Sequence, residues 1–186
     1  QRNILSHPTA KIKCYDRLNL PPAWPRAYQQ EADLIAEALV GVPHAIEHIG
    51  STAVPGLPAK PVIDLMVGVA DYRRSDEIRE ALQAVGYVWD PAAEKHEPAR
   101  KVFRKGPADR RHLRSHHLHL TIVSGDYWRR ILAFRDQLRR DPLAAAEYAA
   151  VKAELLHSCG DNSRAYTRGK REVVKRIERA AGVDVP

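Results

Sequence analysis

The sequence predicts an α+β fold: a mixed β-sheet flanked by helices, with a helical C-terminal third. Residues 61–69 form a nearly continuous apolar run, as in a strand that is buried on both faces. Residues 116–123, HHLHLTIV, alternate between two faces as a strand does. Beyond Gly125 the apolar residues recur at helical spacing, so strands and helices do not alternate as in a doubly wound parallel fold.

The remaining elements follow from the same patterns. Helical spacing covers residues 25–40, where Pro25 suits the first turn of a helix. A second helix is predicted over residues 71–85 and ends at Gly86. Residues 106–115 are polar and basic, as in an exposed loop. Short strands are predicted at residues 45–49, 87–89 and 101–105, and C-terminal helices at residues 126–140, 142–157 and 163–182.

Length and composition bound the class of protein. A chain of 186 residues has the size of one domain, predicted as residues 25–186 after an irregular, proline-containing segment at 1–24. A hydrophobic content of 44% and a charged content of 28% are typical of soluble globular proteins. We find no signal-peptide pattern and no apolar run near the roughly 20 residues that span a membrane. Cys14 and Cys159 form no metal-binding or disulfide pattern, so we expect a cytoplasmic protein without membrane contacts.

The net charge of +7 favours an anionic partner, namely a nucleic acid, a nucleotide or another phosphate compound. Much of the positive charge lies in arginine pairs interleaved with acidic residues, a pattern typical of solvated helix faces. No segment has the pattern of a nucleic-acid-binding arm. A nucleotide or other phosphorylated small molecule is therefore favoured over nucleic acid, and a protein partner is left open.

Residues 50–60, GSTAVPGLPAK, lie between two predicted strands and are rich in glycine, proline and hydroxyl residues, as in a loop. Gly50 at a strand end allows close approach of the backbone, and Ser51 and Thr52 suit the cap of a short helix. Backbone N–H groups and hydroxyls there would form a small cradle for an anion. The alternative is a simple turn with a capped helix end. Lys60 precedes the next strand, where it could meet a phosphate or pair with a carboxylate.

Asp64 interrupts the apolar run of residues 61–69. A buried lone carboxylate is costly unless it is paired, hydrogen-bonded or bound to a metal ion. His117 and His119 share one face of their predicted strand, a spacing common among metal ligands and acid–base residues. The structural alternatives are an ion pair of Asp64 with Lys60 or an arginine, and histidines that serve only packing.

Longer motifs resemble a known family. The stretch HIGSTAVPGLPAKPVIDLMV is similar to the GrpB family, also called UPF0157, a branch of the nucleotidyltransferase superfamily with its polymerase-beta-like fold. The segments KVFRK, HHLHLTIV, YWRRILAFRDQLRRDPLAAAEYAAVKAEL and AYTRGKREVV resemble it as well. The resemblance extends over residues 15–180 and implies a nucleotidyltransferase-like mixed sheet.

The resemblance implies a divalent metal site. Asp64 matches the first of two strand carboxylates that bind metal in nucleotidyltransferases, and Met66 stands at the position of the second. His117 or His119 stands at the position of a third carboxylate, and Glu47 is a further candidate ligand. One aspartate with imidazoles suits a single, softer ion better than two Mg²⁺ ions. We therefore expect Mg²⁺, Mn²⁺ or Zn²⁺, with Asp64 and His119 as catalytic residues.

The resemblance also implies a site for phosphate groups. Gly50 and Ser51 match the Gly-Ser that holds nucleotide phosphates in nucleotidyltransferases, and Thr52 and Lys60 adjoin them. The later motifs add four candidate phosphate-binding residues: Arg104, Arg135, Tyr166 and Lys170. The last two are i and i+4 on a predicted helix, so one helix face presents a phenol and an ammonium together. The alternative for these four is surface ion pairing or, for the tyrosine, packing in the core.

Two principal function hypotheses follow. In the first, the chain is a nucleotidyltransferase-like enzyme that uses a metal at Asp64 and the histidines, with the Gly-Ser loop and Lys60 holding a triphosphate during nucleotidyl transfer to an unknown acceptor. In the second, favoured by Met66, it is a catalytically degenerate module that binds a nucleotide or phosphate ligand without turnover. A weaker third hypothesis, based on the histidines, is a metal-dependent phosphoesterase.

Overall fold

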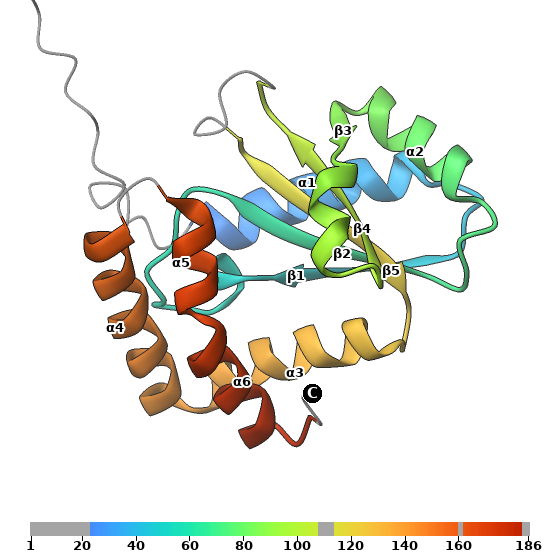
Figure 1. Cartoon of the computed structure of the whole chain (residues 1–186). Coiled ribbons are helices and arrows are strands. Elements are labelled where there is room, and N and C mark those ends of the chain that lie inside the picture. Colours follow the sequence, from blue (N-terminus) through green and yellow to red (C-terminus); the bar gives the residue numbers. More distant parts are fainter. Residues whose placement is uncertain (1–22, 108–113, 160–161, 184–186) are drawn as a thin grey trace, which may run out of the picture.

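The computed structural model describes residues 23–107, 114–159 and 162–183. In this part of the chain five strands form one sheet in the order β1-β2-β5-β4-β3 (Figure 1). The strands are β1 His44–Ile49, β2 Ile63–Val69, β3 Tyr87–Trp89, β4 Arg100–Lys105 and β5 His116–Ile122. β2 and β5 pair in parallel, whereas the other neighbours are antiparallel. The sheet is therefore mixed, which confirms the predicted fold class.

Helices make up most of the remaining described residues. α1 Ala23–Ala38 and α2 Ser75–Ala84 belong to the first half of the chain. The C-terminal third consists of α3 Asp126–Arg140, α4 Pro142–Cys159, α5 Ser163–Gly169 and α6 Arg171–Ala180. Two short 3₁₀ helices are η1 Ser51–Ala53 and η2 Pro91–His96. Within the described ranges, no helix combines the length and apolar character needed to cross a membrane.

The predicted elements agree with the structure to within a few residues, apart from one correction. The helix expected over residues 163–182 is two helices, because a turn at Lys170 separates α5 from α6. At Gly169 a β-carbon would lie 2.3 Å from Leu155 Cδ2 of α4, so the close packing of α4 against this position requires glycine. Glycine is a poor helix former. Residues 1–22 and 108–113, which include much of the predicted N-terminal segment and basic loop, lie outside the described residues.

One face of the sheet carries the main apolar core and packs against α1 and α2. Leu65 of β2 and Leu118 of β5 are register partners, and both are fully buried. The helices cover them with Ile35, Leu39, Ile78 and Leu82. Each such side chain contributes about 1.5–3 kcal/mol when fully buried. This packing holds β2 and β5 in place, so the residues on their opposite face have defined positions.

The opposite face of the sheet packs against α3. Its apolar cluster consists of Ile49, Met66, Tyr127 and Trp128. A further cluster joins the β1–β2 connection to the C-terminal helices, through Val54, Leu57, Leu138, Tyr148, Val173 and Ile177. The connection between β1 and β2 is thus attached to α3, α4 and α6, which are distant from it in the sequence.

Candidate functional site

The chain turns sharply after β1, directly beside Asp64. Ile49, the last residue of β1, is the register partner of Asp64 on β2. Gly50 follows with φ 70° and ψ −170°, a conformation that is essentially restricted to glycine. A β-carbon at Gly50 would lie 2.4 Å from Asp64 Oδ2. Gly50 therefore allows the backbone to lie against the carboxylate, and it starts η1 with Ser51 in this position.

Asp64 is the end of a chain of hydrogen bonds across the sheet. His117 Nδ1 lies 3.2 Å from Asp64 Oδ1, and Arg104 Nη1 lies 3.0 Å from His117 Nε2. Arg104 Nε donates to Asp90 Oδ2 at 2.5 Å. A guanidinium only donates, so Nε2 must accept, and these partners assign the proton to Nδ1, which donates to Asp64. Among the described residues, the carboxylate is thus hydrogen-bonded to a histidine and not to Lys60 or an arginine, and its side chain is 29% exposed.

A buried lysine joins this site from α4. Lys152 is 6% exposed and donates to Ser51 Oγ at 2.9 Å and to the Pro58 carbonyl at 2.5 Å. Its ammonium lies 5.1 Å from the centre of the Tyr148 ring. Burial, assisted by the nearby Lys170, lowers the pKa of Lys152 to about 8. The hydroxyl that sequence reasoning assigned to phosphate binding is therefore held by a charged group from a distant helix.

Two more lysines contact a second tyrosine. The ammonium groups of Lys60 and Lys170 lie 5.2 and 4.7 Å from the centre of the Tyr166 ring. Burial lowers the pKa of Lys170, Asp64 raises it, and Lys60 lowers it further. We call Lys60, Lys152 and Lys170, together with Ser51 and Asp64, the lysine cluster. It contains three ammonium groups and one carboxylate, and Asp64 raises the pKa of both Lys152 and Lys170.

Sequence reasoning missed Lys152 and Tyr148, although a signal for them exists. Tyr148 and Lys152 are i and i+4 on α4, the same spacing as Tyr166 and Lys170. Two Tyr-x-x-x-Lys pairs, YAAVK and YTRGK, therefore occur in the C-terminal third. The first is easily overlooked, because it lies in a helix rich in alanine and leucine. The repeated spacing is the feature that identifies both.

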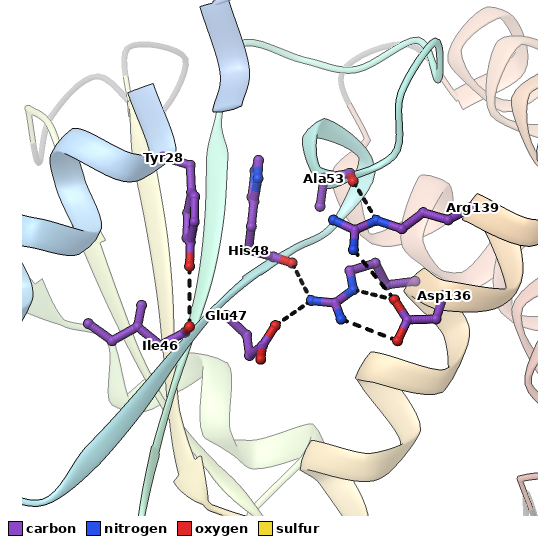
Figure 2. Close-up of polar contacts among 8 residues, drawn as sticks. Tyr28, Ile46, Glu47, His48, Ala53, Asp136 and Arg139 are labelled. Atoms are coloured by element: carbon purple, nitrogen blue, oxygen red, sulfur yellow. Dashed lines mark hydrogen bonds and ion pairs between the residues drawn. The ribbon is translucent and has the colours of Figure 1, made fainter. Parts of the chain in front are cut away.

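Arg135 belongs to a different group of charges (Figure 2). It is 8% exposed and donates through Nη1 to Glu47 Oε2 at 2.6 Å and to the His48 carbonyl at 2.9 Å. Its Nε donates to Asp136 Oδ1 at 2.8 Å. Arg139 lies 3.5 Å from Asp136 and donates to the Ala53 carbonyl. We call Arg135, Arg139, Glu47 and Asp136 the arginine cluster; in it, two arginines face two carboxylates.

Thr52 lies against β1. It is buried, and its Oγ1 lies 3.0 Å from His48 Nε2. The His48 ring stacks on Tyr28 of α1, with ring centres 4.5 Å apart and nearly parallel planes. Burial lowers the pKa of His48 to about 4, so the ring is neutral at pH 7. Thr52 thus serves as an anchor between η1 and β1, and its hydroxyl is directed to His48.

His119 lies two residues along β5 from His117 and faces α3. Its Nδ1 is 2.6 Å from the hydroxyl of Tyr127. Burial, with the nearby Arg100, lowers the pKa of His119 to about 3. The ring is therefore neutral at neutral pH. Met66, its register partner on β2, is fully buried among apolar side chains.

The chain is similar in sequence to proteins of one known family. The model of the GrpB protein family matches residues 18–180. The chain belongs to the GrpB family. A UPF0157 protein of Pseudomonas aeruginosa is 40% identical over 158 residues, which is 84% of this chain and 63% of that protein. For a UPF0157 protein of Bacillus subtilis the values are 33% identity over 158 residues, 85% of this chain and 44% of that protein. The chain thus spans less than two thirds of the length of both relatives.

A solved structure of the same family extends this agreement to three dimensions. The crystal structure of the conserved protein GrpB from Enterococcus faecalis superimposes with a TM-score of 0.75 and 34% sequence identity. The match covers 86% of this GrpB-family chain and 93% of the other. The family resemblance predicted from the motifs is therefore confirmed.

The metal ligands expected from the superfamily resemblance are not assembled in this GrpB-family chain. In the described residues, no three His, Cys, Asp or Glu side chains gather as a metal site. Both ring nitrogens of His117 are engaged, and Glu47 and His119 are bound by side chains of α3. Met66 offers no oxygen. Asp64 is then the one expected carboxylate ligand that is not held by an arginine, so these residues do not fit the expected metal site.

Proposed function

We propose that this chain binds a nucleotide or another phosphorylated small molecule at the lysine cluster, without turnover. The observation that carries the proposal is that three lysines lie in one cluster with Ser51, to which Lys152 donates, and with a single carboxylate, Asp64. Lys60 comes from the β1–β2 connection, Lys152 from α4 and Lys170 from the turn between α5 and α6. Ammonium groups are strong donors to phosphate oxygens.

The burial of Lys152 supports an anionic ligand. A buried ammonium is costly unless an opposite charge accompanies it. Lys152 is almost completely buried, and its two hydrogen bonds go to a neutral hydroxyl and a neutral carbonyl. Asp64 raises the pKa of both Lys152 and Lys170, so two buried ammonium groups share one carboxylate. This excess of positive charge is typical of a binding site more than of a structural ion pair. A bound phosphate would supply the missing negative charge.

The family motif supports a nucleotide as the ligand class. In nucleotidyltransferases, which the GSTAVPGLPAK segment resembles, a Gly-Ser pair holds nucleotide phosphates. Gly50 and Ser51 occupy the matching positions, and Ser51 is the residue that Lys152 contacts. Nucleotidyl transfer and phosphoester hydrolysis are less well supported, because both would use the metal ligands that the described residues do not assemble.

A thermal-shift screen of the full chain tests this proposal. The probes are the four ribonucleoside triphosphates, their monophosphates and inorganic pyrophosphate. A ligand present at a hundredfold excess over its Kd stabilises the folded state by about 2.7 kcal/mol, so a binding probe raises the unfolding midpoint of the wild type. Lys152→Met should lose the shift. Lys95→Met, which removes the same charge from exposed η2, should retain it.

The outcome that contradicts the proposal is equally direct. If no probe shifts the wild type at millimolar concentration, the lysine cluster is not a phosphate site. An equal shift in wild type and Lys152→Met would mean that the ligand binds elsewhere on the chain.

A further inference from the structure

We propose that the lysine cluster binds a chain of linked phosphates without a divalent cation, the three lysines supplying the positive charge that the superfamily resemblance assigns to metal ions. This inference rests on the proposed function and adds two features to it. The ligand carries two or more linked phosphates, and its binding is independent of Mg²⁺.

The surroundings of Asp64 oppose a cation. Its Oδ1 already accepts a hydrogen bond from His117, and its Oδ2 lies against the backbone of Gly50. A divalent ion needs several oxygen ligands, usually including one or two carboxylates. The carboxylate positions expected beside Asp64 are a buried methionine and histidines with engaged nitrogens. The described residues therefore supply one partly covered carboxylate, which is a poor site for Mg²⁺.

The lysines themselves also repel a cation. Three ammonium groups and one carboxylate leave an excess of two positive charges in the lysine cluster. A divalent ion entering the cluster would be repelled by each lysine, and in a partly buried site this repulsion is only weakly screened. The same excess charge attracts a polyanion that arrives without a metal ion.

The order of the lysines suits linked phosphates. The ammonium of Lys152 lies over Tyr148, and the charge of Lys170 lowers the pKa of Lys152. The ammonium of Lys170 lies over Tyr166, and the charge of Lys60 lowers the pKa of Lys170. Lys170 is therefore the neighbour of both other lysines, and we call this order, Lys152, Lys170 and Lys60, the row of lysines. A single phosphate occupies one position in such a row, whereas a di- or triphosphate contacts several positions.

Isothermal titration calorimetry of the full chain with inorganic tripolyphosphate tests this inference. One titration contains EDTA and the other contains excess Mg²⁺. We expect the Kd in EDTA to equal or fall below the Kd in Mg²⁺, because Mg²⁺ neutralises the ligand. Monophosphate should bind at least about tenfold more weakly, since it contacts fewer lysines. Because both conditions use the wild type, the result does not depend on whether a variant folds.

Asp64→Asn distinguishes phosphate binding without a metal ion from binding through a metal ion at Asp64. Asparagine keeps an oxygen that accepts the hydrogen bond from His117 and removes the negative charge. We expect tripolyphosphate to bind Asp64→Asn about threefold or more tightly in EDTA, because a repulsive carboxylate is gone. A metal site predicts the opposite in the titration with Mg²⁺, where Asp64→Asn would lose binding.

The possible failures are distinguishable. Binding of tripolyphosphate only in Mg²⁺, or its loss in Asp64→Asn, overturns the metal-free inference and leaves the proposed function intact. Equal affinity for monophosphate and tripolyphosphate overturns the linked-phosphate part. Absence of binding in both conditions, together with a silent nucleotide screen, overturns the proposed function itself.

Discussion

The arginine cluster and the lysine cluster stand on the same face of the sheet, yet their charges are arranged differently. Glu47 pairs with Met66 across β1 and β2, and Asp64 lies two residues from Met66, so both carboxylates face the same side. In the arginine cluster two arginines face two carboxylates at hydrogen-bonding or ion-pair distance. In the lysine cluster three lysines accompany one carboxylate, and Lys152 donates to neutral groups.

This difference distinguishes a set of charges that stabilises the fold from a candidate binding site. Arg135 has its charge compensated within the fold: burial opposes its charged form, but hydrogen bonds to Asp136 and Glu47 raise its pKa. Lys152 donates its hydrogen bonds to uncharged groups, and burial lowers its pKa. The residue type alone would assign both cations to phosphate binding. The charge balance separates the two: Arg135 has carboxylate partners within the fold, whereas Lys152 donates to neutral groups, and for it we propose an anionic ligand.

Gly50→Ala should have the largest effect on stability, because the added β-carbon would prevent the backbone at residue 50 from lying against Asp64. The backbone conformation of Gly50 and the overlap with Asp64 Oδ2 together should lower the free energy of unfolding by about 3–5 kcal/mol. Gly56→Ala is the matched control, since φ at Gly56 is also positive. Apart from its chain neighbours, no atom of the described residues lies within 4 Å of a β-carbon at Gly56. We expect about 1–2 kcal/mol there, measured by urea denaturation. Equal costs for the two variants would show that the contact with Asp64 contributes nothing.

Arg135→Met should break the arginine cluster. It removes the donor to Glu47 and to the His48 carbonyl and leaves Asp136 with Arg139 alone. Because both carboxylates are partly exposed, we expect a loss of about 2–3 kcal/mol, at or below the lower end for a broken buried ion pair. Exposed Arg140→Met, on the same helix, should change stability by less than about 0.5 kcal/mol. Tripolyphosphate affinity should be unchanged; its loss in Arg135→Met would return this residue to the phosphate site.

The pH dependence of stability should differ between wild type and Lys152→Met. The pKa of Lys152 is about 8 in the folded chain and 10.5 in its ordinary environment. Between these values the unfolded state binds more protons, so the free energy of unfolding of the wild type rises with pH. Relative to Lys152→Met, the gain from pH 7 to pH 10 should be about 2–3 kcal/mol. Urea denaturation at the two pH values measures this gain. A constant difference in the free energy of unfolding between the two proteins would contradict the lowering of the Lys152 pKa by burial.

Lys60→Met should have the smallest effect on stability and still weaken binding. Lys60 is exposed, so its replacement should change the free energy of unfolding by less than about 0.5 kcal/mol. Tripolyphosphate affinity should fall about threefold at low salt and less at high salt, because exposed charges are screened. Lys60→Arg keeps the charge and should keep most of the affinity. Unchanged calorimetric affinity in Lys60→Met would remove this residue from the row of lysines.

Much of the fold could be predicted because its signals are local. The apolar run of β2, the alternation of β5 and the helical spacing beyond Gly125 each require only neighbouring residues. The single error in the C-terminal helices lies at Lys170, next to Gly169, where the absence of a side chain leaves room for Leu155 of α4. That contact joins two helices, so no pattern within either helix contains it.

Part of the candidate site could also be predicted, because it follows from strand geometry. Gly50 follows β1, and Asp64 and His117 are register partners on neighbouring strands, so their proximity needs only the correct pairing. Lys152 could not be predicted in this way. It is 101 residues from Ser51, and their contact depends on how α4 packs against the β1–β2 connection.

By itself, the sequence determined the family, the elements and most of the candidate site residues, because motifs and periodicity are properties of short stretches. Tertiary structure alone decided which of those residues share a site. Glu47, Thr52, Arg135 and His119 acquired partners that serve the fold, whereas Lys60, Lys152 and Lys170 were left with excess charge. The physical reason is that a charge acquires its role from the groups that surround it, and these come from segments far apart in the chain.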